Sequence, residues 1–152
     1  MKERRSILFV CTGNICRSPT AEGVLRSLCE RAGIDLRIES AGLGDWHVGD
    51  PPDERAQQHA RHRGYDLSAQ RARQVRLRDF DEFDLILAMD RGHLRALERM
   101  APARHHAKIR PFAADCDIPD PYDGGPEGFE QVLDLVEAEC RNLLSELKAA
   151  TS

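Results

Sequence analysis

A cysteine, an arginine six positions later and a serine directly after it are the residues of this chain with the clearest chemical potential. They frame the segment Cys11-Thr12-Gly13-Asn14-Ile15-Cys16-Arg17-Ser18. A loop that leaves a strand and opens a helix can turn its backbone N–H groups inward and bind a phosphate dianion at the helix N-terminus. A cysteine at the rim of such a loop lies in a positive field that favours the thiolate, the reactive form. The segment therefore predicts a nucleophilic thiol beside a phosphate site.

Arg17 and Ser18 have side chains that suit a phosphate site beside a nucleophilic sulfur. The planar guanidinium of Arg17 can bind two phosphate oxygens at once, and the Ser18 hydroxyl can donate a hydrogen bond to the sulfur. Two alternatives exist for the segment. Cys11 can be a small buried apolar residue, which is the commonest fate of a free cysteine. A nucleotide-binding loop is excluded because the Gly-Lys-Ser/Thr ending is missing. The backbone donors of the predicted site belong to Thr12, Gly13, Asn14, Ile15, Cys16 and Arg17.

Transfer of a phosphoryl group to sulfur needs an acid, because a phenolate of pKa about 10 leaves poorly unless it is protonated. The segment 115–125 is rich in Gly, Pro and Asp and offers four candidates, which are Asp115, Asp117, Asp120 and Asp123. Their spacing alone does not choose among them. Pro121 biases the residue before it, Asp120, toward an extended conformation. The alternative interpretation of this segment is a solvated acidic loop.

The elements that must position these residues follow from apolar patterning. Residues 6–10 form a short apolar run typical of a buried parallel strand, and apolar residues at helical spacing follow from Pro19, with Ser18 as the expected N-cap and Gly33 near the stop. Further strands are predicted at residues 36–41, 85–89 and 108–112, and helices at residues 54–63, 77–83, 91–100 and 127–149. This alternation predicts an α/β domain with a parallel sheet.

The bulk properties favour one soluble enzyme domain over residues 1–152. Hydrophobic residues make up 41%, and 22 Lys and Arg against 26 Asp and Glu leave a net charge of −4, which argues against nucleic acid as a partner. The apolar run near the N-terminus is too short for a signal peptide or a membrane span, so we expect a cytoplasmic protein without a membrane anchor. Five cysteines are an odd number and suggest free thiols, and the six histidines lack the spacing of a zinc site.

Several motifs together resemble the low-molecular-weight protein tyrosine phosphatase family. They are residues 10–19 (VCTGNICRSP), Ser40-Ala41-Gly42, Trp46-His47-Val48-Gly49, Asp53-Glu54-Arg55-Ala56 and Asp120-Pro121-Tyr122. The resemblance covers nearly the whole chain. It implies a flavodoxin-like sandwich with a four-stranded parallel sheet and helices on both faces. It also implies hydrolysis of protein phosphotyrosine through a cysteinyl-phosphate intermediate, without a cofactor or a metal.

The resemblance assigns roles that spacing left open. Cys11 matches the nucleophile, Arg17 the ligand of the phosphate and the transition state, Ser18 the stabiliser of the thiolate, and Asp120 the acid that later activates water. Asn14 and Ser40 match residues that hold the loop in shape, and Trp46 and Tyr122 match the aromatic walls of the pocket. Cys16 matches a second loop cysteine, for which we expect redox protection of Cys11; the alternative is an inert buried thiol.

Two positions depart from the family pattern. Many members carry a histidine where Gln70 stands, so the support of Asn14 is expected to differ, with Gln70 acting as donor and acceptor in its place. Eukaryotic members carry a second tyrosine where this chain has Asp123, which predicts a less aromatic and more acidic pocket. The arginines at 61, 63, 71, 73, 76 and 78 are interpreted as a solvated face.

Three rival functions share parts of this pattern. A protein arginine phosphatase would use the same loop, but relatives with that activity carry threonine where Ile15 stands. A thiol-dependent arsenate reductase needs a cysteine pair after the third strand, where this chain reads Ala88-Met89-Asp90-Arg91. A phosphotyrosine-binding module without catalysis is disfavoured because both Cys11 and Asp120 are present.

Overall fold

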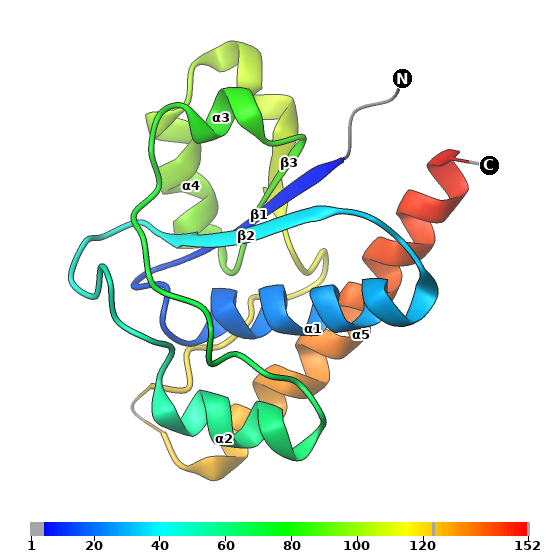
Figure 1. The fold of residues 1–152 in the computed structure, drawn as a ribbon. Helices are drawn as coiled ribbons and strands as arrows, with labels where there is room; N and C mark the ends of the chain where they lie inside the picture. The colour runs from blue at the N-terminus through cyan, green and yellow to red at the C-terminus, as the bar shows by residue number, and fades with distance from the viewer. Residues whose placement is uncertain (1–4, 123, 152) are drawn as a thin grey trace.

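The computed structural model describes residues 5–122 and 124–151, and a four-stranded parallel sheet forms its centre (Figure 1). The strand order is β2-β1-β3-β4, in agreement with the predicted parallel α/β arrangement. β1 pairs with β2 from Ser6 opposite Arg37 to Cys11 opposite Gly42, and with β3 on its other side. The strands are β1 (Ser6–Cys11), β2 (Arg37–Gly42), β3 (Leu85–Ala88) and β4 (Ile109–Pro111).

Helices cover both faces of the sheet because β1 is apolar on both of its sides. Ile7 and Phe9 belong to the core that α1 and α5 cover, whereas Leu8 and Val10 belong to the core under α3 and α4. This division follows the two-residue period of a strand. The helices are α1 (Arg17–Ala32), α2 (Glu54–His62), α3 (Asp79–Glu82), α4 (Arg91–Met100) and α5 (Pro126–Thr151), and a 3-10 helix spans Ala103–Lys108.

The start of α1 differs from the sequence prediction. The helix begins at Arg17, and its N-cap is Cys16, which makes no side-chain capping bond. The expectation that Ser18 is the N-cap is therefore wrong: Ser18 lies inside the first turn, and its hydroxyl faces the Cys11 sulfur. The end of the helix is as predicted, because Gly33 adopts the left-handed conformation with φ 69 that terminates it.

Several of the clustered arginines are parts of ion pairs, and this corrects their interpretation as a solvated face. The Asp79 side chain is fully buried, and Arg73 at 3.0 Å and Arg76 at 3.4 Å neutralise it. Arg63 binds three acids of α5, which are Glu130, Asp134 and Glu137. These arginines hold the long segment between β2 and β3 in place.

The carboxyl ends of the four strands lie at one edge of the sheet, and the loops that follow them meet there. β1 is continued by residues 12–16, β2 by residues 43–53, β3 by Met89 and Asp90, and β4 by the segment that contains Asp120. The chain crosses to opposite faces of the sheet after β1 and after β3, which makes the gap between these strands the expected ligand site. None of the helices in the described ranges combines the length and apolarity that a membrane crossing needs.

Candidate active site

The loop of residues 12–16 is folded against the end of β2. Its backbone is fixed there because the Leu43 N–H donates to the Cys11 carbonyl at 3.0 Å and the Gly44 N–H to the Thr12 carbonyl at 3.1 Å. Gly42 permits this close approach, since a Cβ at that position would lie 2.9 Å from the Thr12 carbonyl oxygen. The loop therefore curls at the N-terminus of α1, as the anion-binding interpretation requires.

Asn14 is the centre of the bonds that fix this curl. It is buried and has φ 59, a left-handed conformation that asparagine tolerates better than most residues. Its amide nitrogen donates to the Ser18 hydroxyl at 2.8 Å and to the Ser40 hydroxyl at 2.9 Å. Ser40 in turn donates to Glu22 at 2.6 Å. Asn14 and Ser40 thus meet in one buried network, together with Glu22, which the sequence did not single out.

The predicted contact between Gln70 and Asn14 does not form. The Gln70 amide nitrogen donates instead to the Pro19 carbonyl at 3.0 Å, and its side-chain oxygen is buried without a hydrogen-bond partner. The third bond of Asn14 comes from the backbone N–H of Arg73, at 3.0 Å from the side-chain oxygen. The segment that contains Gln70 therefore supports the loop through its main chain.

Arg17 is almost fully buried at the base of the loop, with only 4% of its surface exposed. One terminal nitrogen donates to Asp90 and to the Ile118 carbonyl, both at 3.0 Å, and the other lies 3.4 Å from the Thr12 hydroxyl. Burial disfavours the charged form of Asp90, but the hydrogen bond from the His93 N–H, together with the hydrogen bond and the positive charge of Arg17, outweighs burial and lowers its pKa. Arg17 is thus oriented by an ionised partner.

The loop opens into a pocket whose lining includes the candidate acid Asp120. An Asp120 carboxylate oxygen lies 3.7 Å from a terminal nitrogen of Arg17, and Asp120 lines the pocket together with Cys11. Asp117 is instead paired with Arg91 at 3.2 Å, and Asp123 lies outside the described residues. At the mouth, Trp46 is 70% exposed and Tyr122 is 45% exposed. Among the described residues, the lining also includes Thr12, Gly13, Ile15, Cys16 and His47.

Arg55 of α2 holds the loop that carries the candidate acid, a role that sequence analysis did not predict. Its guanidinium donates to the Tyr122 carbonyl at 2.8 Å. It also lies over two rings, 5.7 Å from the centroid of Tyr122 and 4.8 Å from that of Phe129. These contacts fix the pocket side of the Asp120 loop to α2 and α5.

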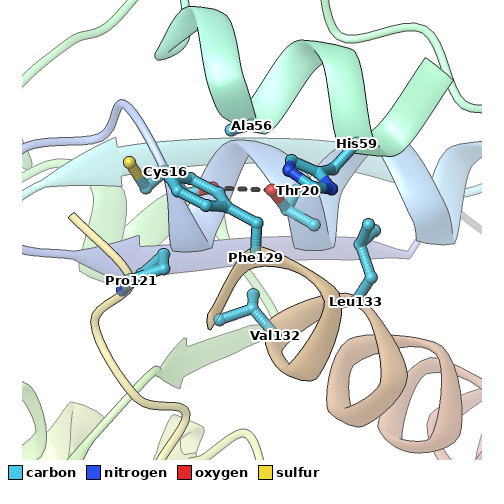
Figure 2. A pocket seen from close by; sticks show the side chains of 8 residues that line it. All are labelled: Cys16, Thr20, Ala56, His59, Pro121, Phe129, Val132 and Leu133. Carbon is cyan, nitrogen blue, oxygen red and sulfur yellow. Dashed lines mark hydrogen bonds between the residues drawn. The ribbon is translucent and has the colours of Figure 1, made fainter. Parts of the chain in front are cut away.

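Cys16 lies between the pocket and a small apolar cavity behind the loop (Figure 2). Burial raises the pKa of its thiol, and the negative charges of Asp53 and Cys11 raise it further. Thr20 donates to the Cys16 carbonyl at 2.7 Å, so the next turn of α1 fixes the backbone. The other cavity residues are Ala56, His59, Pro121, Phe129, Val132 and Leu133.

Fold and pocket together define a class of protein, the cysteine-dependent phosphatases built on a parallel α/β sheet. A family model described as low molecular weight phosphotyrosine protein phosphatase matches residues 6–152, and the chain belongs to this family. A low molecular weight protein-tyrosine-phosphatase of Streptomyces coelicolor is 46% identical and covers 93% of both chains. A putative low molecular weight protein-tyrosine-phosphatase of Synechocystis is 45% identical, over 93% of this chain and 95% of its own length.

A solved structure of a related phosphatase has the same fold over nearly the whole chain. The protein tyrosine phosphatase of Entamoeba histolytica, crystallised with Hepes in its active site, has a TM-score of 0.92 and 34% sequence identity to this chain. The match covers 97% of this chain and 99% of that one. The four-stranded flavodoxin-like sandwich that the sequence predicts is therefore confirmed.

Proposed function

We propose that this protein hydrolyses phosphotyrosine monoesters of proteins through a cysteinyl-phosphate intermediate. One observation carries the proposal: the Cys11 sulfur, the Arg17 guanidinium and the Asp120 carboxyl line one pocket with exposed aromatic rings at its mouth. The names of the relatives support the same activity.

The first step forms a bond between sulfur and phosphorus. The loop N–H groups and Arg17 bind the phosphate oxygens and stabilise the charge that develops on them in the transition state. The Cys11 thiolate attacks phosphorus, and the bond from phosphorus to the tyrosine oxygen breaks. Asp120, which borders the pocket from the opposite loop, donates a proton to the departing oxygen. The products of this step are cysteinyl phosphate and the substrate protein with its tyrosine dephosphorylated.

The second step returns the enzyme to its starting state. Asp120, now ionised, takes a proton from a water molecule, and the water oxygen attacks phosphorus as the bond to sulfur breaks. The hydroxyl of Ser18, 3.0 Å from the sulfur, stabilises the thiolate that leaves. Inorganic phosphate is released. The same aspartate serves as acid and then as base, as microscopic reversibility requires.

The pocket favours an aryl phosphate over the alternatives. Trp46 and Tyr122 offer rings against which a phenyl group can stack. Ile15 adds an apolar wall where a guanidinium phosphate would need a hydroxyl partner. An arsenate reductase would need a cysteine pair after β3, but that segment holds Met89 and Asp90, and Asp90 is paired with Arg17. The buried Cys140 lies in the core covered by α1 and α5, away from this edge.

The cellular setting is part of the proposal. We infer that the protein acts in the cytoplasm as a single domain, on phosphotyrosine proteins, and binds neither nucleic acid nor a membrane. The net charge of −4 supports the exclusion of nucleic acid. Fractionation of cells that express the tagged protein tests the location.

The mechanism is tested with two variants of the pocket. Cys11→Ser should abolish turnover but still bind phosphotyrosine peptides, and Arg17→Lys should lose most activity because an ammonium group cannot bind two oxygens in one plane. Cys116→Ser is the matched control and should be fully active, because Cys116 is an exposed cysteine in the segment between β4 and α5. Near-normal hydrolysis by either pocket variant would contradict the mechanism.

Side-by-side assays decide between the rival substrates. The wild type should turn over phosphotyrosine peptides with a higher kcat/KM than phosphoarginine peptides, and it should not reduce arsenate in the presence of thiols. A preference for phosphoarginine, thiol-dependent arsenate turnover, or peptide binding without any hydrolysis would each replace the proposed function.

A further inference from the structure

His93 is a buried histidine beside the pocket to which the two catalytic steps give no task. It lies in the first turn of α4 and is only 5% exposed. One ring nitrogen, Nε2, lies 2.8 Å from the Thr12 hydroxyl of the phosphate loop. The other, Nδ1, lies 3.3 Å from an Asp90 carboxylate oxygen and has no aligned hydrogen-bond partner. The ring thus connects the loops that follow β1 and β3.

The two groups that His93 contacts are also bound by the catalytic arginine. One terminal nitrogen of Arg17 lies 3.4 Å from the Thr12 hydroxyl, and the other donates to Asp90 at 3.0 Å. Arg17, Thr12, His93 and Asp90 therefore form a closed ring of contacts around the guanidinium. The backbone N–H of His93 strengthens this ring by donating to Asp90 at 2.8 Å.

The Asp90 carboxylate selects the tautomer of His93. An ionised carboxylate only accepts, so Nδ1, which faces an Asp90 oxygen at 3.3 Å, carries the single proton of the neutral ring. Nε2 is then the acceptor, and the Thr12 hydroxyl donates to it while accepting from Arg17. Burial lowers the pKa of His93 and the charge of Arg17 lowers it further, whereas Asp90, Asp120 and Asp117 act in the opposite direction. The net lowering keeps the imidazole neutral at neutral pH.

We propose that neutral His93 is a positioning residue that aligns the Arg17 guanidinium with the phosphate by holding both of its partners, Thr12 and Asp90. This inference rests on the proposed function. Bidentate binding of phosphate requires the guanidinium plane to be correct within narrow limits, and misplacement by about 1 Å can cost about 10²-fold in rate. Without His93, the Thr12 hydroxyl loses the acceptor that sets its direction, and Asp90 loses a neighbour on its free side.

Protonation of His93 should disturb this alignment. A charged imidazole has no acceptor nitrogen, so Thr12 can no longer donate to it. It also adds a positive charge near Arg17 and competes for Asp90. Phosphate binding by the wild type should therefore weaken at acid pH more than protonation of the phosphate itself explains.

Three variants at position 93 test the proposal. His93→Leu removes both polar contacts, His93→Asn keeps an amide near Asp90 but is too short for Thr12, and His93→Gln restores an acceptor that can reach Thr12. Two measurements are made: kcat and KM with an aryl phosphate, and the Kd for inorganic phosphate by calorimetry. For His93→Leu we expect kcat/KM to fall about 10- to 100-fold and the Kd for phosphate to rise. His93→Gln should recover more of both than His93→Asn.

The pH profile separates positioning from packing. The ratio of kcat/KM between wild type and His93→Leu cancels the titration of the substrate, and it should shrink toward acid pH because only the wild type has an imidazole to charge. In combination with Thr12→Val, the loss caused by His93→Leu should be smaller than in the wild type, since the two residues act through one bond. A ratio that is constant with pH, or fully additive losses, would overturn the proposal.

The proposal remains testable if the His93→Leu variant does not fold. If His93→Leu is not folded, an equal phosphate Kd for the Gln and Asn variants, or a kcat/KM ratio of wild type to His93→Gln that is constant with pH, would overturn the proposal. Phosphate binding is measured without turnover, so the result is independent of the proposed function. A wild type that binds phosphate but hydrolyses no aryl phosphate would refute the function and still leave His93 testable.

Discussion

The Ser18 hydroxyl oxygen lies 3.0 Å from the Cys11 sulfur and accepts a hydrogen bond from the Asn14 amide at 2.8 Å. A thiolate has no hydrogen to donate, so the Ser18 hydroxyl is the donor in this contact when Cys11 is ionised. Ser18 is fully buried, so this donor does not exchange its partner for water. A fixed donor at this place stabilises negative charge on the sulfur before attack and again when the thiolate leaves.

Removal of this donor should impair both steps. We expect Ser18→Ala to lower kcat about 10- to 100-fold, the range for a lost hydrogen bond to a charged group. Alkylation of Cys11 by iodoacetamide at neutral pH should slow in parallel, because the sulfur loses the donor that stabilises its negative charge. Ser27→Ala, on the same helix and away from the pocket, is the control. Unchanged alkylation together with unchanged kcat would mean that Ser18 has only a packing role.

The acid role of Asp120 predicts a dependence on the leaving group. Asp120→Asn should reduce turnover of phosphotyrosine by roughly 10²–10⁴-fold. The loss should shrink for an activated aryl phosphate, whose oxygen departs without a proton. Asp117→Asn is the matched control, since Asp117 is exposed and paired with Arg91. A severe loss of turnover in Asp117→Asn together with a mild loss in Asp120→Asn would mean that Asp120 is not the acid.

The local parts of the site could be predicted from the sequence because neighbours in the chain determine them. The apolar run of β1 ends at Cys11, and the turn residues after it lead directly into α1. Arg17 and Ser18 are then brought near the sulfur by the first helical turn alone. Spacing alone could not choose among the four candidate acids, because that choice depends on how two distant loops meet; the family resemblance was needed to select Asp120.

The remaining parts of the site depend on long-range packing. The expected contact of Gln70 with Asn14 fails because the main chain at Arg73 occupies that side of the amide. The roles of Glu22 and Arg55 depend on partners 18 and 67 residues away. The position of Asp90 before a helix is a local signal that predicts an N-cap residue. No local signal predicts its ion pair with Arg17, because the two residues are distant in the chain.

Arg55 should affect aryl substrates but not phosphate itself. Arg55→Ala removes the bond to the Tyr122 carbonyl and the contact over its ring, so the wall of the pocket loosens. We expect a rise in KM for aryl phosphates of about 3- to 10-fold, which corresponds to about 1 kcal/mol. The inhibition constant of inorganic phosphate should stay unchanged. Arg61→Ala, on the same helix, is the control, and a weaker phosphate inhibition in Arg55→Ala would contradict this role.

Glu22 should make the stability of the protein depend on pH. Burial raises its pKa, although the Ser40 hydroxyl and Arg26 oppose the shift. Between the usual and the raised value the folded state binds more protons than the unfolded state, so the free energy of unfolding falls as pH rises through this window. Glu22→Gln keeps an oxygen for Ser40 and should lack this fall. Urea unfolding between pH 4 and pH 8 measures it, with Glu30→Gln as the exposed control, and parallel curves for wild type and Glu22→Gln would contradict the prediction.

We predict that Cys16 protects the nucleophile against irreversible oxidation. Its side chain is buried against Ala56 and Phe129, and it lines the pocket that also contains Cys11. The raised pKa of its thiol makes it a poor target for peroxide, whereas a thiolate at Cys11 is a good one. Peroxide converts the Cys11 thiolate to sulfenic acid, and attack by the Cys16 sulfur would form a disulfide and release water. The curled loop must bring the two α-carbons within about 7 Å for this bond to close.

Reversibility of peroxide inactivation distinguishes protection from packing at Cys16. The wild type should lose activity in peroxide and recover fully after treatment with a dithiol reductant, which reopens the disulfide. Cys16→Ser should lose activity permanently, because its sulfenic acid has no neighbouring thiol and is oxidised further to sulfinic acid, which the dithiol does not reduce. Cys116→Ser keeps both loop cysteines and should recover like the wild type. Mass spectrometry of the oxidised protein should find the peptides of Cys11 and Cys16 joined. Equal recovery of the wild type and Cys16→Ser would leave Cys16 with a packing role alone, since its contacts with Phe129 and Ala56 do not depend on the oxidation of Cys11.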